Sequence, residues 1–276
     1  DVYKRQTPRL VGSLDDDSAS ISKILYEQII QSKIISSSVK VVEISKLVEN
    51  TFRDVNIALS NEVAKICEIY DIDVQELFTI CNSHPRVNLL QPGPGVGGPC
   101  LPKDPYLLLN PEGLQRITST LIEHSRKSND SMPKHVVELL TKSLMLQNKK
   151  IDNSKILILG IAYKGNVSDH RLSPATEVVS QLQEANSDVL IFDPKVKDYL
   201  DGLKVDDLWN SLKTIDAIIV LADHDEFKKL DLHKIYRLMK KNPILLDTRR
   251  IFDKYQAEEI GFHYISIGYT TSLKHK

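Results

Sequence analysis

The sequence predicts an α/β protein in which a central helical region is followed by a doubly wound parallel sheet. Apolar residues recur every three or four positions from Val42 to Ile69, which predicts one long helix. Beyond residue 150, short apolar runs alternate with helical segments, as in parallel sheets covered on both faces. A third observation is the glycine- and proline-rich stretch Gly93–Asp104, which has neither period and therefore indicates a functional loop.

Length and composition exclude several classes of protein. The 276 residues suffice for two domains with cores, and 41% hydrophobic and 26% charged residues are ordinary globular values. A formal net charge of −1 gives no reason to expect a nucleic acid or a membrane as a partner. We find no initiator Met, no signal peptide and no apolar run of membrane-spanning length. Three cysteines without a CxxC pair predict free thiols in a reducing cytoplasm.

The first forty residues predict a short βα fragment. Arg9–Gly12 is expected to end a strand, and Ser36–Val42 to form another extended segment. The acidic run Asp15–Ser18 between them could suggest a metal site, but negative charge and a capping residue favour a helix N-terminus before ISKILYEQII.

The long helix carries two polar residues of interest. About 40 Å of helix with a broad apolar face suggests packing against more than its own subunit. Lys46 and Asn50 lie four positions apart and share one face, where they could serve an oxyanion or simply meet solvent. Cys67 follows the apolar stripe and is expected in the core. Asp73 is expected to cap a further helix, Val74–Cys81.

The loop GPGVGGPCLPKD has a composition suited to a rigid pocket lined by backbone. Glycine permits close approach and positive φ, and proline stiffens the chain between glycines. Cys100 stands just before a helix expected at Tyr106–Leu109 and close to Lys103, a setting that favours the thiolate. From composition alone, an inert structural turn is an equally good interpretation.

The C-terminal region predicts the parallel sheet itself. A helix from Gly113 to Gln147, broken at Pro133, precedes a polar linker at Asn148–Ser154. Helices are expected from Ser173 to Ala185 and from Lys229 to Lys240. The expected strands are Lys155–Gly160, Asp188–Pro194, Asp216–Leu221, Ile244–Asp247 and His263–Ile267.

Two features of this sheet imitate cofactor sites. Asp193 ends the second strand as the acid of an NAD site does, but the first turn, GIAYKGN, lacks the glycine spacing for a pyrophosphate. The run Asp223–Glu226 resembles metal ligands, although a helix N-cap cluster is the safer interpretation.

Cations follow two of the expected strands. Lys164 comes after the first strand and Arg249 after the one that ends at Asp247. Carboxyl ends of parallel strands meet at one edge, where ligands bind, so this pair suits a diphosphate. Arg250 is an open alternative to Arg249.

Four blocks of the chain resemble the UDP-glucose/GDP-mannose dehydrogenase superfamily, the nucleotide-sugar 6-dehydrogenases. They occur in the family's order and cover nearly the whole chain. The blocks are EISKLVENTFRDVNIALSNE (Glu43–Glu62), HPRVNLLQPGPGVGGPCLPKDPYLL (His84–Leu108), ILGIAYKGNVSDHRLSP (Ile158–Pro174) and LLDTRRIF (Leu245–Phe252).

The resemblance implies three regions. Residues 1–41 would be the remnant of an NAD-binding Rossmann domain, 42–150 a helical domain that forms a homodimer, and 151–276 a Rossmann-like domain for the UDP-sugar. The family's first domain opens with a G-x-G-x-x-G fingerprint, which we expect this chain to lack because it begins at DVYKRQTPRLVG. Roughly 150 residues, about one domain, are then expected to be missing, and the fragment itself to be inactive.

The resemblance also assigns roles to individual residues. No metal is expected. The expected catalytic residues are Cys100, Lys46, Asn50 and Asp104. The expected substrate-binding residues are Arg86, Gly97, Gly98, Lys164 and Arg249. The expected NAD contacts are Lys103 and Arg171. Arg86 would reach the neighbouring subunit's site, although by sequence alone it is an ordinary surface arginine.

The implied reaction is a four-electron oxidation of a sugar C6 alcohol to a carboxylate with two NAD⁺. Cys100 would hold the aldehyde as a thiohemiacetal and then as a thioester, which water hydrolyses. Lys46 and Asn50 would stabilise the charged oxygen, and Asp104 would orient water or hold Lys46.

The substrate and the class of function have alternatives. The cysteine block resembles the N-acetylhexosamine branch, which favours UDP-N-acetyl-D-mannosamine over UDP-glucose and UDP-N-acetylglucosamine. A cysteine hydrolase or acyltransferase with His84 as base is a second class of function. A non-catalytic, nucleotide-sugar-binding dimer module is a third.

Overall fold

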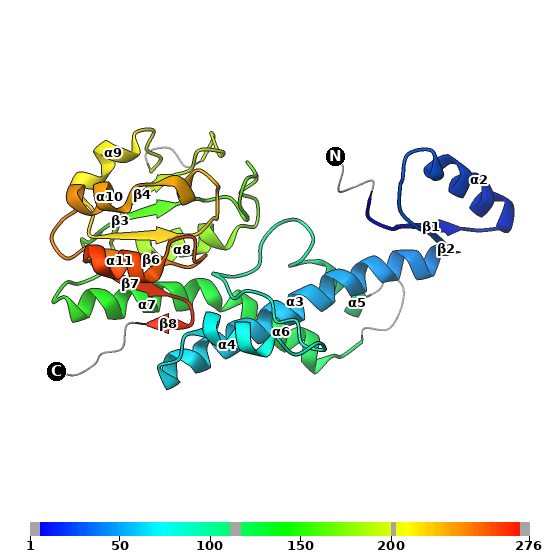
Figure 1. The fold of residues 1–276 in the computed structure, drawn as a ribbon, viewed down its shortest axis with the longest axis horizontal. Coiled ribbons are helices and arrows are strands. Elements are labelled where there is room, and N and C mark those ends of the chain that lie inside the picture. The colour runs from blue at the N-terminus through cyan, green and yellow to red at the C-terminus, as the bar shows by residue number, and fades with distance from the viewer. Residues whose placement is uncertain (1–5, 111–116, 200–202, 271–276) are drawn as a thin grey trace. The chain divides into compact units, whose positions relative to one another are not determined.

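The computed structural model describes residues 6–110, 117–199 and 203–270 (Figure 1). The contacts between residues divide the chain into two compact units. The first unit comprises Asp1–Arg53 and Lys103–Ser119, and the second comprises Asp54–Pro102 and Thr120–Lys276.

The first unit contains two short parallel strands and a helix between them. Strand β1 (Arg9–Ser13) pairs with β2 (Ile34–Ser38), and α2 (Asp16–Glu27) connects them. Asp15 caps α2 by accepting the backbone N–H of Ser18 at 2.7 Å, which confirms a helix start rather than a metal site at the acidic run. None of the twelve residues described in α2 is buried.

The unit continues into the long helix α3 (Val39–Tyr70), which extends into the second unit. The extended segment expected up to Val42 is therefore too long, because β2 ends at Ser38 and the helix begins at the next residue. At 1.5 Å per residue, the 32 residues of α3 span about 48 Å. The short helix α5 (Asp104–Leu109) also belongs to the first unit.

The second unit is built on a sheet with the strand order β4-β3-β5-β6-β7-β8. Neighbouring strands are parallel except for β7 and β8, so the predicted parallel sheet is confirmed. The strands are β3 (Lys155–Leu159), β4 (Asp188–Phe192), β5 (Ala217–Val220), β6 (Ile244–Asp247), β7 (His263–Ser266) and β8 (Tyr269–Thr270).

Alternate side chains of each strand enter two cores, one on each face of the sheet. In β3, Ile156 and Ile158 join one core, and Leu157 and Leu159 join the other. The doubly wound arrangement follows from this pattern, because a strand buried on both faces needs helices on both sides.

Helices cover each face (Figure 1). The first face packs against the end of α3 and against α4 (Val74–Cys81), α7 (Met132–Leu146) and α8 (Pro174–Glu184). The other face packs against α9 (Leu208–Ser211), η1 (Leu212–Thr214), η2 (Phe227–Lys229), α10 (Leu232–Leu238) and α11 (Lys254–Ile260).

Local signals set several boundaries of these helices. Helix α6 (Thr120–Asp130) ends just before α7, whose first turn contains Pro133, so the predicted break is confirmed. The predicted start at Gly113 lies outside the described residues, and residues 117–119 are not helical, so the described helix begins later than expected. Ser173 caps α8 through the backbone N–H of Ala175. In the described part of the chain, no helix combines the length and apolar character needed to cross a bilayer.

Candidate functional site

The cysteine loop lies between α4 and α5 and has no regular secondary structure from Gly93 to Pro102. Gly95 and Gly98 have φ of +125° and +89°, which side-chain-bearing residues rarely adopt. The expectation that the chain lacks G-x-G-x-x-G is wrong, because Gly93–Gly98 reads GPGVGG. It is not a dinucleotide fingerprint, since no strand precedes it and no helix begins at its last glycine.

The second half of the loop packs closely on the turn that follows β3 and on the start of α8. A Cβ added to Gly97 would lie 2.6 Å from the carbonyl oxygen of Leu172 and 2.6 Å from Cδ of Pro174. A Cβ on Gly98 would lie 2.8 Å from the ring of Tyr163. Both glycines are therefore required by close approach, and the carboxyl edge of the sheet forms one wall of the loop.

Arg249 reaches the beginning of the same loop. Its guanidinium Nη1 would lie 3.1 Å from a Cβ placed on Gly93, and its Nε donates to the carbonyl of Leu221 at 2.9 Å. Asp247, at the end of β6, accepts the backbone N–H groups of Arg249 and Phe252 and so shapes the turn. Burial raises the pKa of Asp247 to about 6, against the opposing effect of these hydrogen bonds.

Arg250 has a different role from its neighbour. Its Nη1 donates to Oδ1 of Asp73 at 2.7 Å, and Lys254 pairs with the other oxygen of that carboxylate. Asp73 also caps α4 through the backbone N–H of Gln75. Arg250 therefore holds α4 to the sheet, and the geometry favours Arg249 as the cation of the site.

Lys164 lies on the other side of the loop wall. Its Nζ is 5.6 Å from the centroid of the Tyr163 ring, and its side chain is exposed. Since that ring also packs on Gly98, the second unit brings together a cation, an aromatic face and the glycine backbone.

A buried polar network, which the sequence reasoning missed, holds the first glycine of the loop. Oδ1 of Asn61 on α3 accepts the N–H of Gly93 at 2.9 Å, and its Nδ2 donates to Oδ1 of Asn129 at 3.0 Å. Asn129 donates in turn to the backbone carbonyl and the carboxylate of Asp54, both at 2.9 Å. Arg126 completes the network by pairing with Asp54 and Asp130.

The pattern in the sequence that could have revealed this network is polar residues on the inner face of a predicted helix. Asp54 and Asn61 lie two turns apart in α3, and both are fully buried. The motif RKSND at Arg126–Asp130 carries their partners. Buried polar groups need partners, so polar residues at these positions indicate that partners exist but not where in the chain they lie.

The carboxylate of Asp193 binds the backbone N–H groups of the turn after β3. Its Oδ2 accepts the backbone N–H groups of Ile161 and Ala162 at 2.8 and 3.2 Å, and the ring of His224 lies 3.2 Å away. These are the N–H groups that would face a pyrophosphate, so the turn does not fit a dinucleotide. The interpretation that Asp193 is not an NAD acid is therefore supported by the structure.

The run Asp223–Glu226 has a different function from the expected helix cap. Asp223 accepts the N–H of Gly165 at 2.9 Å, and Nδ1 of His224 accepts the N–H of Asn166 at 2.9 Å. The helix-cap interpretation is wrong, because these side chains instead fix the turn after β3. Among the described residues, no three side chains are grouped as metal ligands.

The first unit holds the remaining predicted catalytic residues. Nδ2 of Asn50 donates to Oδ2 of Asp104 at 2.6 Å, and both residues are buried. Nζ of Lys46 lies 3.6 Å from Glu49 on the exposed surface of α3, so the observed partner of Asp104 is Asn50 rather than Lys46. Lys103 is exposed directly before α5.

The other predicted site residues lie on exposed turns of the second unit. Arg171 forms two hydrogen bonds to Asp169, at 2.8 and 3.0 Å, which lower the pKa of Asp169 to about 2. Arg86 is exposed, and its backbone N–H donates to Nδ1 of His84.

The three cysteines have different surroundings. Cys100 is exposed, Cys81 is half-buried, and Cys67 is buried in the core, as predicted. Burial raises the pKa of Cys67, which makes that thiol a poor nucleophile.

This geometry defines a class of protein: an α/β protein with Lys164 and Arg249 at the carboxyl edge of its sheet and an exposed thiol on an adjoining glycine loop. Residues 40–131 match the central domain of the UDP-glucose/GDP-mannose dehydrogenase family, and residues 157–254 match that family's UDP binding domain. The chain belongs to the UDP-glucose/GDP-mannose dehydrogenase family.

Curated relatives and solved structures agree with this family. The UDP-N-acetyl-D-mannosamine dehydrogenase of Methanocaldococcus jannaschii is 40% identical over 265 residues, which cover 95% of this chain and 60% of that protein. The structure of the UDP-D-ManNAc dehydrogenase from Pyrococcus horikoshii matches 97% of this chain and 62% of its own, at 36% identity and a TM-score of 0.85.

The structure of an NDP-N-acetyl-D-galactosaminuronic acid dehydrogenase from Methanosarcina mazei Go1 matches equally well, with a TM-score of 0.85. It is 31% identical, with 98% of this chain and 59% of the other covered. The chain thus spans about 60% of the length of the relatives that it matches.

Proposed function

We propose that this chain is the catalytic-loop and nucleotide-sugar-binding portion of a nucleotide-sugar 6-dehydrogenase. The enzyme would oxidise the C6 hydroxyl of a UDP-sugar to the carboxylate, with UDP-N-acetyl-D-mannosamine as the first candidate. The observation that carries the proposal is the contact of the cysteine loop with the carboxyl edge of the sheet, where Arg249 lies against Gly93. Family membership and the names of the relatives support the same reaction.

The diphosphate would bind at that edge. Arg249 and Lys164 supply two positive charges, and Gly97 and Gly98 let the loop backbone lie close against the turn after β3 and the start of α8. Arg86, whose side chain is exposed, would contribute to the site of a second subunit.

The thiol of Cys100 would act as the nucleophile. Its thiolate adds to the C6 aldehyde to give a thiohemiacetal, and loss of two further electrons gives a thioester that water hydrolyses to the acid. A covalent aldehyde stays in the site between the two oxidations. The exposure of Cys100 supports this role, because an aldehyde must reach the sulfur.

Asn50, Asp104 and Lys46 would stabilise the charged oxygen. The hydrogen bond from Asn50 to Asp104 fixes the orientation of the amide and leaves its second N–H for an oxyanion. Lys46 would release Glu49 and supply a positive charge, as the resemblance implies. These roles require that Lys46 and Cys100 meet at one substrate, which stays a prediction.

NAD⁺, when bound, accepts hydride. Lys103 and Arg171 are the residues of this chain that we propose to contact it, and both are exposed. The turn after β3 does not fit the cofactor, because Asp193 already accepts its N–H groups. Free thiols at all three cysteines fit a reducing compartment such as the cytoplasm.

A homodimer through α3 is part of the proposal. Large apolar side chains with 47–81% exposure recur along α3 at spacings of three and four or their sums. An exposed stripe of this kind is typical of a helix that packs against a second copy. The residues of the stripe are Ile44, Val48, Phe52, Leu59, Ile66 and Ile69.

Two experiments on the full-length enzyme test the reaction. In a panel of UDP-N-acetylmannosamine, UDP-N-acetylglucosamine, UDP-glucose and GDP-mannose with NAD⁺, we expect the highest kcat/KM for the first sugar. Cys100→Ala is expected to abolish formation of the acid because no thioester can form. Unchanged acid production by that variant would refute the mechanism. Turnover without any dependence on NAD⁺ would instead favour a cysteine hydrolase.

A further inference from the structure

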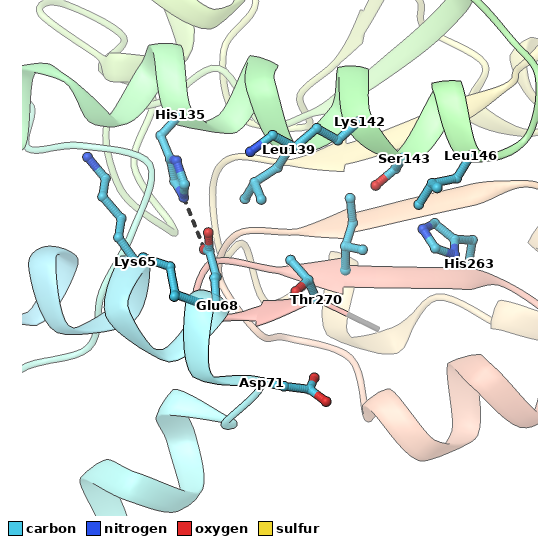
Figure 2. Close-up of a pocket in the computed structure, with 12 residues that line it drawn as sticks. Lys65, Glu68, Asp71, His135, Leu139, Lys142, Ser143, Leu146, His263 and Thr270 are labelled. Carbon is cyan, nitrogen blue, oxygen red and sulfur yellow. Dashed lines mark hydrogen bonds and ion pairs between the residues drawn. The ribbon is translucent and has the colours of Figure 1, made fainter. Parts of the chain in front are cut away.

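The second unit contains a cavity that is separate from the proposed active site. It has a volume of about 520 Å³ and lies between the end of α3, helix α7 and strands β7 and β8 (Figure 2). His263, which lines it, begins β7 and pairs in register with Ile244, the first residue of β6. One part of the cavity therefore lies at the amino edge of these strands, whereas Arg249 follows the carboxyl end of β6.

The cavity has an apolar floor suited to the body of a small molecule. Leu139 and Leu146 from α7 and Ile265 from β7 line it. Its volume is within the range of about 300–1,000 Å³ that is usual for small-molecule sites.

Three polar side chains around the floor lack protein partners. Lys142 and His263 have no side-chain hydrogen bond or ion pair to any residue that the structure describes, and neither does the hydroxyl of Ser143. Ser143 is 4% exposed, and its hydroxyl faces the cavity without a protein partner in the described part of the chain. Burial lowers the pKa of His263, so the neutral ring offers one N–H and one acceptor at pH 7.

Two carboxylates also line the cavity, those of Glu68 and Asp71, and the one of Glu68 already has partners. Oε1 of Glu68 accepts from Nε2 of His135 at 3.0 Å (Figure 2). The same oxygen accepts the backbone N–H of Gly268 at 2.9 Å. Lys65, at the same end as Glu68, adds a positive charge and donates to Ser131 at 3.0 Å. The donors of Lys142, Ser143 and His263 therefore lie beside the apolar floor, whereas the two carboxylates come from Glu68 at the end of α3 and from Asp71 just after it.

We propose that this cavity binds a small amphipathic anion. Its carboxylate or phosphate would accept from Lys142, Ser143 and His263, and its hydrocarbon body would lie on Leu139 and Leu146. Such a ligand supplies an acceptor to the donors of Lys142, Ser143 and His263 and covers the apolar floor at once, whereas an inorganic ion would leave that floor in contact with water.

Binding to the cavity is tested with 4-phenylbutyrate as the carboxylate ligand and 3-phenylpropyl phosphate as the phosphate ligand. The neutral 4-phenylbutyramide, which has the same hydrocarbon body without the charge, is the control ligand. Dissociation constants are measured on the 276-residue chain by titration calorimetry and ligand-observed NMR. We expect at least one anion to bind about tenfold more tightly than the amide, because one charge-assisted hydrogen bond is worth about that factor. Which anion binds better identifies the head group.

Two lysine variants of α7 locate the binding. Lys142→Met is expected to weaken the anion about tenfold and leave the amide unchanged. Lys134→Met is the matched control, because Lys134 is an exposed lysine of the same helix that does not line this cavity. Saturating UDP is expected to leave the affinity unaltered. Equal binding of anions and amide, equal effects of the two variants, displacement by UDP, or no saturable binding would each overturn the proposal.

Discussion

At the scale of single residues, Asn61 links the long helix α3 to the cysteine loop. The side-chain oxygen of Asn61 accepts the N–H of Gly93, and its side-chain nitrogen donates to Asn129, so the amide cannot rotate without losing both hydrogen bonds. The loop that carries Cys100 therefore begins from a backbone N–H fixed to α3, within the second unit.

We predict that Asn61→Ala lowers the free energy of unfolding by about 1–3 kcal/mol, because two buried groups lose their partners. Urea titration of the 276-residue chain measures this loss. The control is Glu62→Ala, the exposed neighbour on α3, which is expected to change stability little. If both variants had the same stability, the amide would not hold the loop.

Asp193 predicts a dependence of stability on pH. Burial acts to raise the pKa of Asp193, but hydrogen bonds from His224 and from the N–H groups of Val196, Ile161 and Lys195 outweigh it and lower the pKa to about 2. A carboxyl with a depressed pKa stabilises the fold above its unfolded value and loses that contribution as pH falls.

The stabilisation by Asp193 is therefore expected to be complete near neutral pH and to disappear as pH falls from about 4 to about 2. Its size is about 2 kcal/mol at pH 7. Asp193→Asn should be less stable than wild type by about that amount at pH 7 and should differ little near pH 2. Urea midpoints across this range measure the difference. The exposed Asp206→Asn provides the control, and a constant difference at every pH would contradict the assignment.

The sequence could predict some site residues and not others for a physical reason. Lys164 and Arg249 could be placed together because the carboxyl ends of parallel strands meet at one edge. Asp54 and Asn61 could not, because a polar residue in a helix is expected to face solvent unless its partner is known. Their partners at Arg126 and Asn129 lie about 70 positions further along the chain.

At the scale of elements, α3 is the structure from which an assembly can be predicted. Its exposed apolar stripe continues over most of its length, although the helix also carries buried residues on the opposite side. A single helix thus supplies both a core contact and the proposed dimer contact.

We predict that Leu59→Glu converts a dimer into a monomer, because a charge in the middle of the stripe would be buried without a partner. Sedimentation velocity or light scattering would show twice the chain's mass for wild type and the single mass for the variant. Ile80→Glu, an exposed apolar position on α4, should stay dimeric. A monomeric wild-type chain would rule out the stripe as a stable interface.

The elements were predictable where a local signal fixes their ends. Asp15, Asp73 and Ser173 cap helices at the predicted positions. The end of β2 carried no such signal, because Ser38–Val42 is compatible with strand and helix alike. Helix α11 and strand β8 were not predicted, since α11 has seven residues and β8 has two.

At the scale of the whole chain, ligand binding separates the proposed functions. We predict that the 276-residue chain binds UDP weakly and NAD⁺ hardly at all, because the proposed diphosphate site lies in the second unit and the turn after β3 does not fit a dinucleotide. Calorimetry measures both affinities, and Lys164→Met should weaken UDP, whereas the exposed Lys134→Met should not. NAD⁺ binding tighter than UDP binding would contradict this assignment of domains.

The short strand pair β1–β2 affects what hydrogen exchange and thermal unfolding would report about this chain. The two strands β1 and β2 are short, and the helix α2 that connects them has no buried residue, so this part of the chain cannot protect its amides well from hydrogen exchange. The second unit, by contrast, has strands buried on both faces. In a hydrogen–deuterium exchange experiment, the backbone amides of β1 and β2 would exchange early and those of β3, β5 and β6 last, which gives two kinetic classes. A melting temperature followed by fluorescence of Trp209 would therefore describe the second unit alone.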